Sequence, residues 1–469
     1  MKHERKRPGL LLSLLTIVGI IVILLVGSKN SVPTVILMLI NMILLMALCV
    51  WGLHIPYKEV ELDLLGGLRE AIIAPLILIC SGLLIASWIQ CGTVPMLIYY
   101  GLGWMNVKWI LVASFLLCAV LCSCIGTSWG TAGTVGIACV SVGVSMGVPL
   151  EMMVGAVLSG AIFGDKLSPL SDTTILASST SEINIFSHVR AMATTAIPTL
   201  VLCCVGYYLL GLRYVNLEMN TALIEQVRTA LAENFNFSVV LLIPMVLIIT
   251  LSLCKIPALP TLLTAAFSGS LLAMLVQGDS PSAIFTTMNK GCVFSTGVEM
   301  VDTMLSKGGV TSMMSTVATV MVALALGGLL KSGGFLEPIV HFLTDRVRTD
   351  CGLILVTILS GLILTSLVPT FTVVMVLMGG MFRDKYDERK IHRSMLSRSM
   401  EDATTIVLPF VPWNASCIYY MGLFGLTTMS FAPYTFFCWG NLIISVLCTC
   451  CGLFVRKVRT PEEMLPGAD

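Results

Sequence analysis

The sequence contains few charged residues for its length. Only 11% of its 469 residues are Asp, Glu, Lys or Arg, whereas an ordinary globular protein devotes about 25% to them. Hydrophobic residues make up 57% of the chain and the mean hydropathy is +0.96, which excludes a soluble enzyme. A membrane-spanning helix needs about 20 apolar residues, so this length has room for about 10 to 13 of them and for no large aqueous domain. We therefore predict an all-α polytopic membrane protein, embedded in the lipid of the cell membrane.

Signatures of several other classes of protein are missing as well. The net charge is +1, so the charge gives no reason to expect a nucleic-acid partner. The 17 cysteines lack two separated C-x-x-C pairs and are interpreted as small packing residues rather than zinc ligands. No H-E-x-x-H motif occurs, and the G-x-S-x-G pattern at 126–130 lacks a histidine partner, because the five histidines lie at termini or segment ends. We expect neither an enzyme nor a cofactor.

Four apolar stretches are interrupted by glycine, proline, hydroxyl-bearing and acidic residues, at about 107–148, 150–188, 351–382 and 397–430. Irregular backbone is stable at membrane depth only where protein or a watery cavity satisfies its polar groups, and paired interruptions in two halves of a chain indicate a transporter's binding site. The landmarks of the two halves lie at almost constant separations: 241 residues from Gly92 to Gly333, 238 from Thr127 to Thr365, and 236 from Asp165 to Glu401. This spacing predicts an internal repeat.

A topology follows if 107–148 and 351–382 are re-entrant hairpins and the other two broken segments each cross once. The chain then makes about 10 full crossings plus two hairpins, and its termini share a side. On this topology 20 basic residues fall on the side of the termini and six on the other, a positive-inside bias that places both termini in the cytoplasm. The hairpins enter from opposite faces, so the repeats are predicted to be inverted. The predicted units are N-terminal helices (1–54), a first repeat (55–212), a polar connecting loop (213–236), connecting and scaffold helices (237–310), a second repeat (311–456) and a cytoplasmic tail (457–469).

The most informative motif is GDKLSPLSDTT, residues 164–174, which lies between two apolar runs. Pro169 removes a backbone donor and disfavours helix at the preceding residue, which frees carbonyl groups where carboxylates and hydroxyls collect. Oxygen ligands suit small hard cations such as Na⁺, and a buried carboxylate can hold a proton instead. The candidate site for Na⁺ and H⁺ consists of Asp165, which would bind the ion, with Ser168, Ser171, Asp172 and Thr173.

Each charged residue of this motif also has a structural interpretation. Asp165 could pair with Lys166 or cap a helix, although a charge at bilayer depth costs roughly 2.5 to 3.5 kcal/mol and is functional by default. Asp172 could be the N-cap of the next helix. Lys166 is either a permanent counter-charge or a contact for an anion, and the sequence leaves both open.

Residues 126–134, GTSWGTAGT, have the composition of a hairpin tip, where the hydroxyls of Thr127 and Ser128 would face a ligand. The alternative is close helix packing through Gly126 and Gly130, because G-x-x-x-G spacing lets helices approach each other. We therefore add Thr127 and Ser128 to the candidate cation site.

In the second half, Glu401 and Asp402 precede a helix that prolines interrupt. Adjacent acids on a helix cannot both face one direction, so we expect one at the site and one that caps the helix or pairs with Arg398. Of the two, Glu401 is slightly favoured for the structural role.

Three segments resemble the NhaC-type Na⁺/H⁺ antiporters, a family that includes malate/lactate exchangers: SGAIFGDKLSPLSDTT (159–174), SKGGVTSMMSTVATVMVALALGGLL (306–330) and SMEDATTIVLPFVPWNAS (399–416). The resemblance extends over about residues 55–455. It implies a secondary transporter of the ion-transporter superfamily, with two inverted repeats that each carry a re-entrant hairpin and a broken helix. The residues that it assigns to substrate sites are Asp165, Ser168, Ser171, Asp172 and Thr173 in the first repeat and Glu401, Asp402, Thr404 and Asn414 in the second.

The second hairpin departs from the pattern of this family. Members often carry an acid and an amide there, where this chain has Thr370 and Phe371. We include Ser366 and Thr370 of this hairpin in the second-repeat site. The missing acid favours a substrate other than Na⁺ and H⁺ alone.

The sequence thus predicts a Na⁺/H⁺ antiporter that works by alternating access, in which Asp165 binds Na⁺ or H⁺ competitively and neighbouring hydroxyls and carbonyls complete the ion shell. The alternative is a coupled exchanger of organic acids such as malate and lactate, with Lys166 or hydroxyls near the substrate carboxylate. A passive channel, a different class of protein, would conduct without counter-transport. The sequence leaves the oligomeric state, including a homodimer, open.

Overall fold

The computed structural model describes residues 7–30, 32–104, 106–169, 171–214, 221–254, 256–298, 301–302, 305–344, 347, 349–368 and 370–458. Within these ranges the regular elements are helices, and one isolated β-bridge joins Ile391 to Lys457. Seven of the described helices are long and apolar enough to cross a membrane, or up to ten if each bent helix pair counts as one span. The predicted all-α polytopic membrane fold is confirmed.

The helices form two sets that follow the same order, with other helices before and between them. The first set comprises α4 (Ile73–Gln90), α5 (Thr93–Trp104), α6 (Val107–Ile125), α7 (Ser128–Thr131), η2 (Ala132–Gly136), α8 (Ile137–Ser145), α9 (Leu150–Leu167), α10 (Asp172–Thr180) and α11 (Ile185–Leu212). The second set comprises α17 (Val310–Ser332), α18 (Glu337–Thr344), α19 (Asp350–Leu367), α20 (Phe371–Glu388), α21 (Arg393–Ala403), η5 (Thr405–Phe410), α22 (Ala415–Phe424), α23 (Thr428–Phe431), η6 (Ala432–Tyr434) and α24 (Phe436–Cys450). The other helices are α1 (Leu10–Lys29), α2 (Thr34–Ala47), η1 (Leu48–Gly52), α3 (Tyr57–Ala71), α12 (Thr221–Asn234), η3 (Val239–Leu242), α13 (Ile243–Leu253), α14 (Ala258–Leu272), η4 (Ala273–Gln277) and α15 (Pro281–Lys290).

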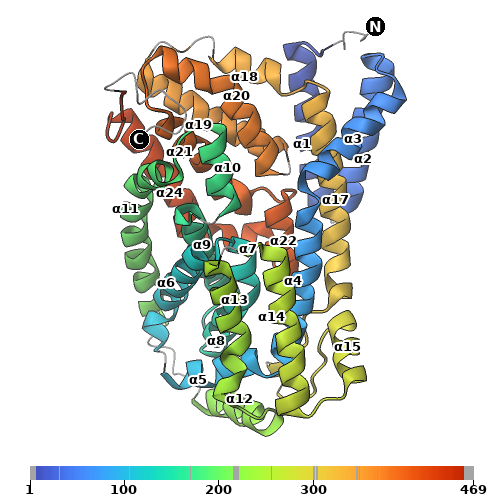
Figure 1. The fold of residues 1–469 in the computed structure, drawn as a ribbon, viewed down its shortest axis with the longest axis vertical. Helices are drawn as coiled ribbons and strands as arrows, with labels where there is room; N and C mark the ends of the chain where they lie inside the picture. Colours follow the sequence, from blue (N-terminus) through green and yellow to red (C-terminus); the bar gives the residue numbers. More distant parts are fainter. Residues whose placement is uncertain are drawn as a thin grey trace.

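The two sets run in opposite directions through the molecule (Figure 1). The hairpin of α6 with α7 and α8 enters from the end formed by α5 and α12, whereas the hairpin of α19 and α20 enters from the end that carries both termini. Each hairpin is followed by a helix pair broken near mid-height, α9 with α10 and α21 with α22. Both predicted hairpins are therefore present, and the repeats are inverted. The predicted unit boundaries stay a prediction.

The turn of the first hairpin depends on a glycine. Gly126 ends α6 in the left-handed conformation, with φ 77°, and its N–H donates to the Cys122 carbonyl. Glycine adopts this conformation without a steric penalty, so the chain can reverse immediately before Thr127 and Ser128. The hairpin tip therefore presents its hydroxyls deep inside the protein.

Two glycines of α9 allow this helix to lie directly against α6. A Cβ atom at Gly160 would meet the carbonyl oxygen of Phe115, and one at Gly164 would meet that of Ala119. Small residues at such positions let membrane helices approach backbone to backbone. This packing fixes the position of Asp165, the residue after Gly164, relative to the hairpin.

Replacing Gly160 with Ala should therefore destabilise the protein. An added methyl group against a backbone carbonyl cannot be relieved by a rotamer change, and such overpacking costs about 1 to 3 kcal/mol. Gly380→Ala is the matched control, because a Cβ atom at Gly380 in α20 meets nothing within 4 Å. Thermal unfolding of the purified protein, followed by the reaction of its cysteines with a fluorogenic reagent, should show a lower midpoint for Gly160→Ala only. Equal midpoints for the two variants would contradict this account of the packing.

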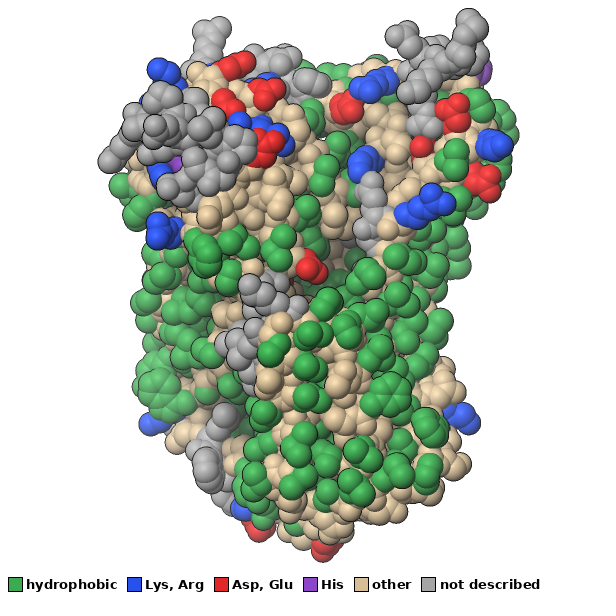
Figure 2. Space-filling view, in the orientation of Figure 1, with side chains coloured by type: hydrophobic (Ala, Val, Ile, Leu, Met, Phe, Trp, Pro, Cys, Tyr) green, Lys and Arg blue, Asp and Glu red, His purple; other side chains and the backbone are tan. Residues whose placement is uncertain are grey.

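Charged side chains gather at the two ends of the molecule, mainly at the end that carries the termini, and a hydrophobic band separates the two ends (Figure 2). This distribution is what a membrane-spanning protein requires. Several basic residues counted in the sequence lie outside the described residues, namely Lys2, Arg5, Lys6, Lys255, Arg346, Arg348 and Arg459, as does the predicted tail from residue 459 onward. The cytoplasmic location of the termini stays a prediction.

Candidate functional site

The two hairpin tips and the two helix breaks surround one cavity of about 420 Å³. It lies between the two halves of the molecule, where the space-filling view shows a recess (Figure 2). Eight of the residues predicted from the sequence line this cavity: Thr127, Ser128, Asp165, Ser171, Asp172, Thr173, Thr370 and Asn414. The structure therefore brings both repeats to a single site.

Asp165 occupies the last turn of α9 and connects the first hairpin tip to the first helix break. Its Oδ2 accepts a hydrogen bond from Ser128 Oγ at 2.7 Å, and its Oδ1 accepts one from Ser171 Oγ at 2.6 Å. Among the described residues, Asp165 forms no ion pair; in particular it does not pair with its neighbour Lys166. The carboxyl group is thus held by neutral hydroxyls, which leaves it able to take up a cation or a proton.

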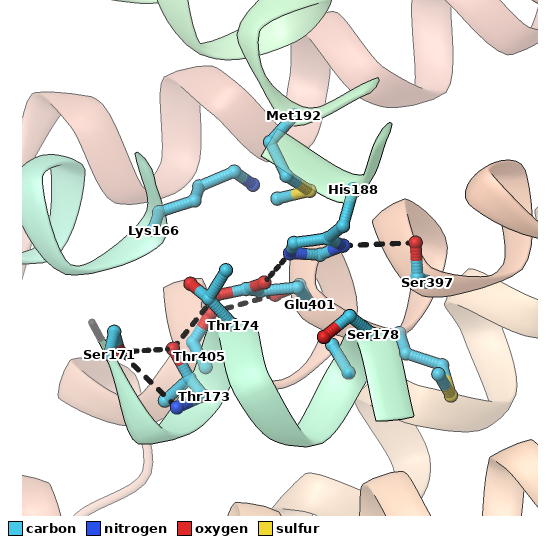
Figure 3. Close-up of polar contacts among 12 residues, drawn as sticks. Lys166, Ser171, Thr173, Thr174, Ser178, His188, Met192, Ser397, Glu401 and Thr405 are labelled. Carbon is cyan, nitrogen blue, oxygen red and sulfur yellow. Dashed lines mark hydrogen bonds and ion pairs between the residues drawn. The ribbon is translucent and has the colours of Figure 1, made fainter. Parts of the chain in front are cut away.

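A chain of oxygen atoms links this carboxyl group to a second one in the other repeat. Ser171 Oγ lies 2.9 Å from Thr173 Oγ1, and Thr173 Oγ1 donates to Glu401 Oε1 at 2.9 Å (Figure 3). Asp165 and Glu401, which are equivalent residues of the two repeats, are therefore joined through two hydroxyl groups. Glu401 is fully buried and does not line the cavity itself.

The hydrogen-bond count along this chain shows how many protons it needs. Three contacts join the Asp165 carboxyl, two hydroxyls and the Glu401 carboxyl. Each hydroxyl group supplies one proton, so Ser171 and Thr173 together provide two protons for three contacts. One further proton, on either carboxyl group, makes every contact a hydrogen bond when both hydroxyl groups donate away from that carboxyl group. A pair of carboxyl groups that shares one proton satisfies the chain completely.

The far end of the chain is closed by a histidine. His188 Nε2 lies 2.7 Å from Glu401 Oε2, and His188 Nδ1 lies 2.9 Å from Ser397 Oγ (Figure 3). His188 is in the first turn of α11 and is fully buried. Both ring nitrogens thus have a partner, which fixes the orientation of the Glu401 carboxyl group.

The neighbouring charges form a separate, fully buried ion pair. Lys166 Nζ pairs with Asp402 Oδ1, and both side chains are 0% exposed. Asp402 also accepts hydrogen bonds from Asn441 Nδ2 at 3.0 Å and from Ser445 Oγ at 2.6 Å, both in α24. Of the two adjacent acids, Asp402 is therefore the paired one, and its partner is Lys166 rather than Arg398. Glu401 faces the hydroxyl chain instead.

The remaining predicted residues are placed differently. Ser168, Ser366 and Thr404 do not line the cavity, and their hydroxyls donate to the backbone carbonyls of Ser123, Leu362 and Met400 at 2.9, 2.8 and 2.8 Å. Asp172 is the first residue of α10 and is exposed to the cavity, whereas Ser171 is the N-cap and accepts from the Thr173 N–H.

Helix N-termini converge on the cavity. The helix that begins with α7 and continues through α8, and the helices α10, α20 and α22, all start at residues that line it. Unpaired N–H groups give a helix N-terminus a partial positive charge, which favours anions. Asn414 adds a donor. Its Oδ1 accepts from the Ser416 N–H, whereas its Nδ2 has no hydrogen-bond partner in the described part of the chain, although the residue is only 1% exposed. The cavity can therefore hold a carboxylate as well as a cation at Asp165.

Four residues that support the site were not found from the sequence: His188, Ser397, Asn441 and Ser445. His188 carries no signal in its spacing, because it lies one helix beyond the GDKLSPLSDTT motif, whereas Ser397 lies four residues before Glu401 on α21. Asn441 and Ser445 carry one as well, because together with Thr449 they are polar residues spaced four apart on one face of the largely apolar α24. That pattern indicates a buried polar contact.

Comparisons with known proteins identify relatives over most of the chain. The profile of the Na⁺/H⁺ antiporter family matches residues 9–184 and 160–453. The chain is 34% identical over 400 residues to the malate-2H⁺/Na⁺-lactate antiporter of Bacillus subtilis (strain 168), covering 85% of each protein. It is 31% identical over 409 residues to the Na⁺/H⁺ antiporter NhaC of the same organism, covering 87% of the chain and 90% of the relative. It is 34% identical over 409 residues to the arginine/ornithine antiporter ArcD of Halobacterium salinarum, covering 86% and 84%.

Proposed function

Because the chain belongs to the Na⁺/H⁺ antiporter family, we propose that it is a secondary active antiporter that works by alternating access and exchanges Na⁺ for H⁺ at Asp165. The three relatives described above are antiporters rather than enzymes. We place the protein in the cell membrane with both termini in the cytoplasm, on the basis of the positive-inside bias.

The hydrogen-bond count is the observation that carries this proposal. Without a metal ion, one shared proton satisfies the chain from Asp165 to Glu401. When that proton leaves, one of the three contacts has no hydrogen between its two oxygen atoms, and a small hard cation near the Asp165 carboxylate can take the place of the lost positive charge. Na⁺ and H⁺ would then occupy the site by turns, because the same oxygen atoms satisfy only one of them at a time. Such competition couples the two flows.

Alternating access is supported by the hydrogen bonds that join Asp165 to its neighbours. Its two oxygens bridge the hairpin tip at Ser128 and the helix break at Ser171. The chain from Asp165 through Ser171 and Thr173 continues to Glu401 in the other repeat, so movement of one repeat against the other would break this chain and change the end from which the cation is reached. The inverted arrangement of the repeats provides two related conformations for this movement.

A second candidate function is the coupled exchange of a small organic acid. The cavity of about 420 Å³ is far larger than a cation requires, and helix N-termini and the unpaired Asn414 Nδ2 provide contacts for a carboxylate. Two relatives are named for malate and lactate or for arginine and ornithine, which all carry a carboxylate beside a hydroxyl or amino group. We propose a carboxylate of this class as the alternative substrate.

Transport by the purified protein in liposomes tests both candidates. A pH-sensitive dye reports proton movement when Na⁺ is added, and labelled malate or lactate reports uptake driven by a Na⁺ gradient. A pH change without labelled uptake supports plain Na⁺/H⁺ exchange, whereas uptake that depends on the gradient supports the organic acid. The absence of both the pH change and the labelled uptake would contradict the proposed antiport.

Asn414→Asp should weaken carboxylate transport selectively. Aspartate keeps the N-cap of α22 but replaces the free amide donor with a negative charge that repels a carboxylate. We expect the KM for malate or lactate to rise by about tenfold or more, which corresponds to about 1.4 kcal/mol. Asn414→Ser, a cap of similar strength without the charge, is the control. Equal KM values for the two variants would contradict a carboxylate at this position.

A further inference from the structure

A second cavity, of about 260 Å³, lies away from Asp165 at the end opposite the termini. It is lined by the last residues of α4, α12 and the helix formed by α14 with η4, which are Gln90, Asn234 and Gln277. Asn236, Asp279 and Thr287 are further polar residues of its lining. Neither the motifs of the sequence nor the exchange proposed for Asp165 uses this cavity.

The helix ends give this cavity a negative potential. The last carbonyl groups of a helix lack intrahelical partners, so a helix C-terminus carries a partial negative charge. Three C-termini converge here, and the Asp279 carboxylate adds a full negative charge. Among the described residues that line the cavity, none is basic. The polarity is thus opposite to that of the central cavity, where N-termini converge.

A buried oxygen atom without a partner points to a missing ligand. Gln90 is only 9% exposed, yet its Oε1 has no hydrogen-bond partner among the residues that the structure describes. A buried acceptor left without a partner costs about 1 to 3 kcal/mol, so its retention in a polar cavity indicates something that it can bind. This oxygen atom can bind a hydrogen-bond donor or a cation, and the helix C-termini and the Asp279 carboxylate favour a cation.

The wall of the cavity is already fixed by other hydrogen bonds. Gln277 Nε2 donates to the carbonyls of Cys91 at 2.8 Å and Asn236 at 3.1 Å, and Gln277 Oε1 accepts from the Asn236 N–H at 2.9 Å. These bonds tie the ends of α4 and of the α14–η4 helix to the segment after α12. They leave Gln90 Oε1, the Asp279 carboxylate and the Thr287 hydroxyl to contact a ligand.

We infer that this cavity binds a monovalent metal cation, with Na⁺ as the ion to be tested, at a site separate from Asp165. The available contacts are oxygen atoms, which hard cations prefer. One carboxylate matches one positive charge, whereas divalent ions are usually held by several carboxylates. The volume also accommodates water molecules, at about 30 Å³ each, that would complete the coordination shell.

Equilibrium binding of ²²Na⁺ to the purified full-length protein tests this inference. In the Asp165→Asn variant the proposed central site is removed, so the remaining saturable binding should come from the second cavity. Adding Asp279→Asn should then weaken this binding by at least tenfold, whereas adding Glu225→Gln, an acid-to-amide change at a 70% exposed side chain of α12, should not. Unlabelled Na⁺ should displace the label, and choline should not.

The outcomes are separable from those of the proposed function. Two results would overturn the second site even if the wild type exchanges Na⁺ for H⁺. The first is that the Asp165→Asn protein shows no saturable ²²Na⁺ binding, and the second is that adding Asp279→Asn leaves this binding unchanged. Displacement by Ca²⁺ at much lower concentration than by Na⁺ would overturn the monovalent assignment. If the double variant does not elute as a single species, Gln90→Met in the Asp165→Asn background provides the same test, because it removes the unpaired oxygen and leaves the charge unchanged.

Discussion

Asp165→Asn is expected to abolish Na⁺-driven proton movement in everted membrane vesicles while the protein still inserts into the membrane. The amide side chain can keep a hydrogen bond with Ser128 or Ser171, but it cannot release a proton or neutralise Na⁺. Both occupants of the site are lost together, so exchange should fall to the level of vesicles without the protein. Fluorescence quenching by a pH-sensitive dye measures the loss, and immunoblotting measures insertion.

Glu225→Gln is the control for this experiment, because it makes the same change of charge at an exposed position of α12. It should leave exchange at the wild-type level. Wild-type exchange in the Asp165→Asn protein would remove Asp165 from the mechanism.

Lys166→Met should strongly destabilise the protein, because it leaves the fully buried Asp402 carboxylate without its counter-charge. Removing one partner of a buried ion pair costs about 3 to 5 kcal/mol. Adding Asp402→Asn should recover much of that loss. The Asn side chain is neutral; its oxygen can still accept a hydrogen bond from Asn441 Nδ2, and its amide nitrogen, in the place of Oδ2, can donate one to Ser445 Oγ.

Thermal unfolding in detergent measures both effects. Removal of the exposed Glu225–Arg228 pair by Glu225→Gln is the reference, since a surface pair contributes about 0 to 1 kcal/mol. Equal unfolding midpoints for Lys166→Met and the Lys166→Met/Asp402→Asn double variant would contradict the conclusion that this buried ion pair stabilises the contact between the two repeats.

The hairpins and helix breaks could be predicted because their causes are local. Gly126 ends a helix and Pro169 prevents one from continuing, and both effects act within a few residues of the chain. The separations of 241, 238 and 236 residues between the three pairs of landmarks likewise predict that Asp165 and Glu401 are equivalent residues of the two repeats. The cluster of Ser128, Asp165 and Ser171 was therefore within reach of the sequence.

The partners of the adjacent acids Glu401 and Asp402 could not be predicted from the sequence. Successive residues on a helix point about 100° apart, so the sequence shows that Glu401 and Asp402 face different surroundings. Which surroundings these are depends on how the other repeat packs, since Lys166 lies 236 residues from Asp402 and His188 lies 213 residues from Glu401. Local patterns do not encode such contacts. Only the assembled structure distinguishes Glu401, which contacts the hydroxyl chain, from Asp402, which pairs with Lys166.

The central claim is that Na⁺ and H⁺ compete for the Asp165 site, and the Na⁺ affinity measured against pH tests it most directly. The measurement is made on the Asp279→Asn protein, so that the second cavity does not contribute. If one proton must leave for each Na⁺ that binds, the apparent Kd for Na⁺ should rise by about tenfold for each unit of acidification over the range in which the proton occupies the site. A Kd for Na⁺ that stays constant across that range would contradict the claim.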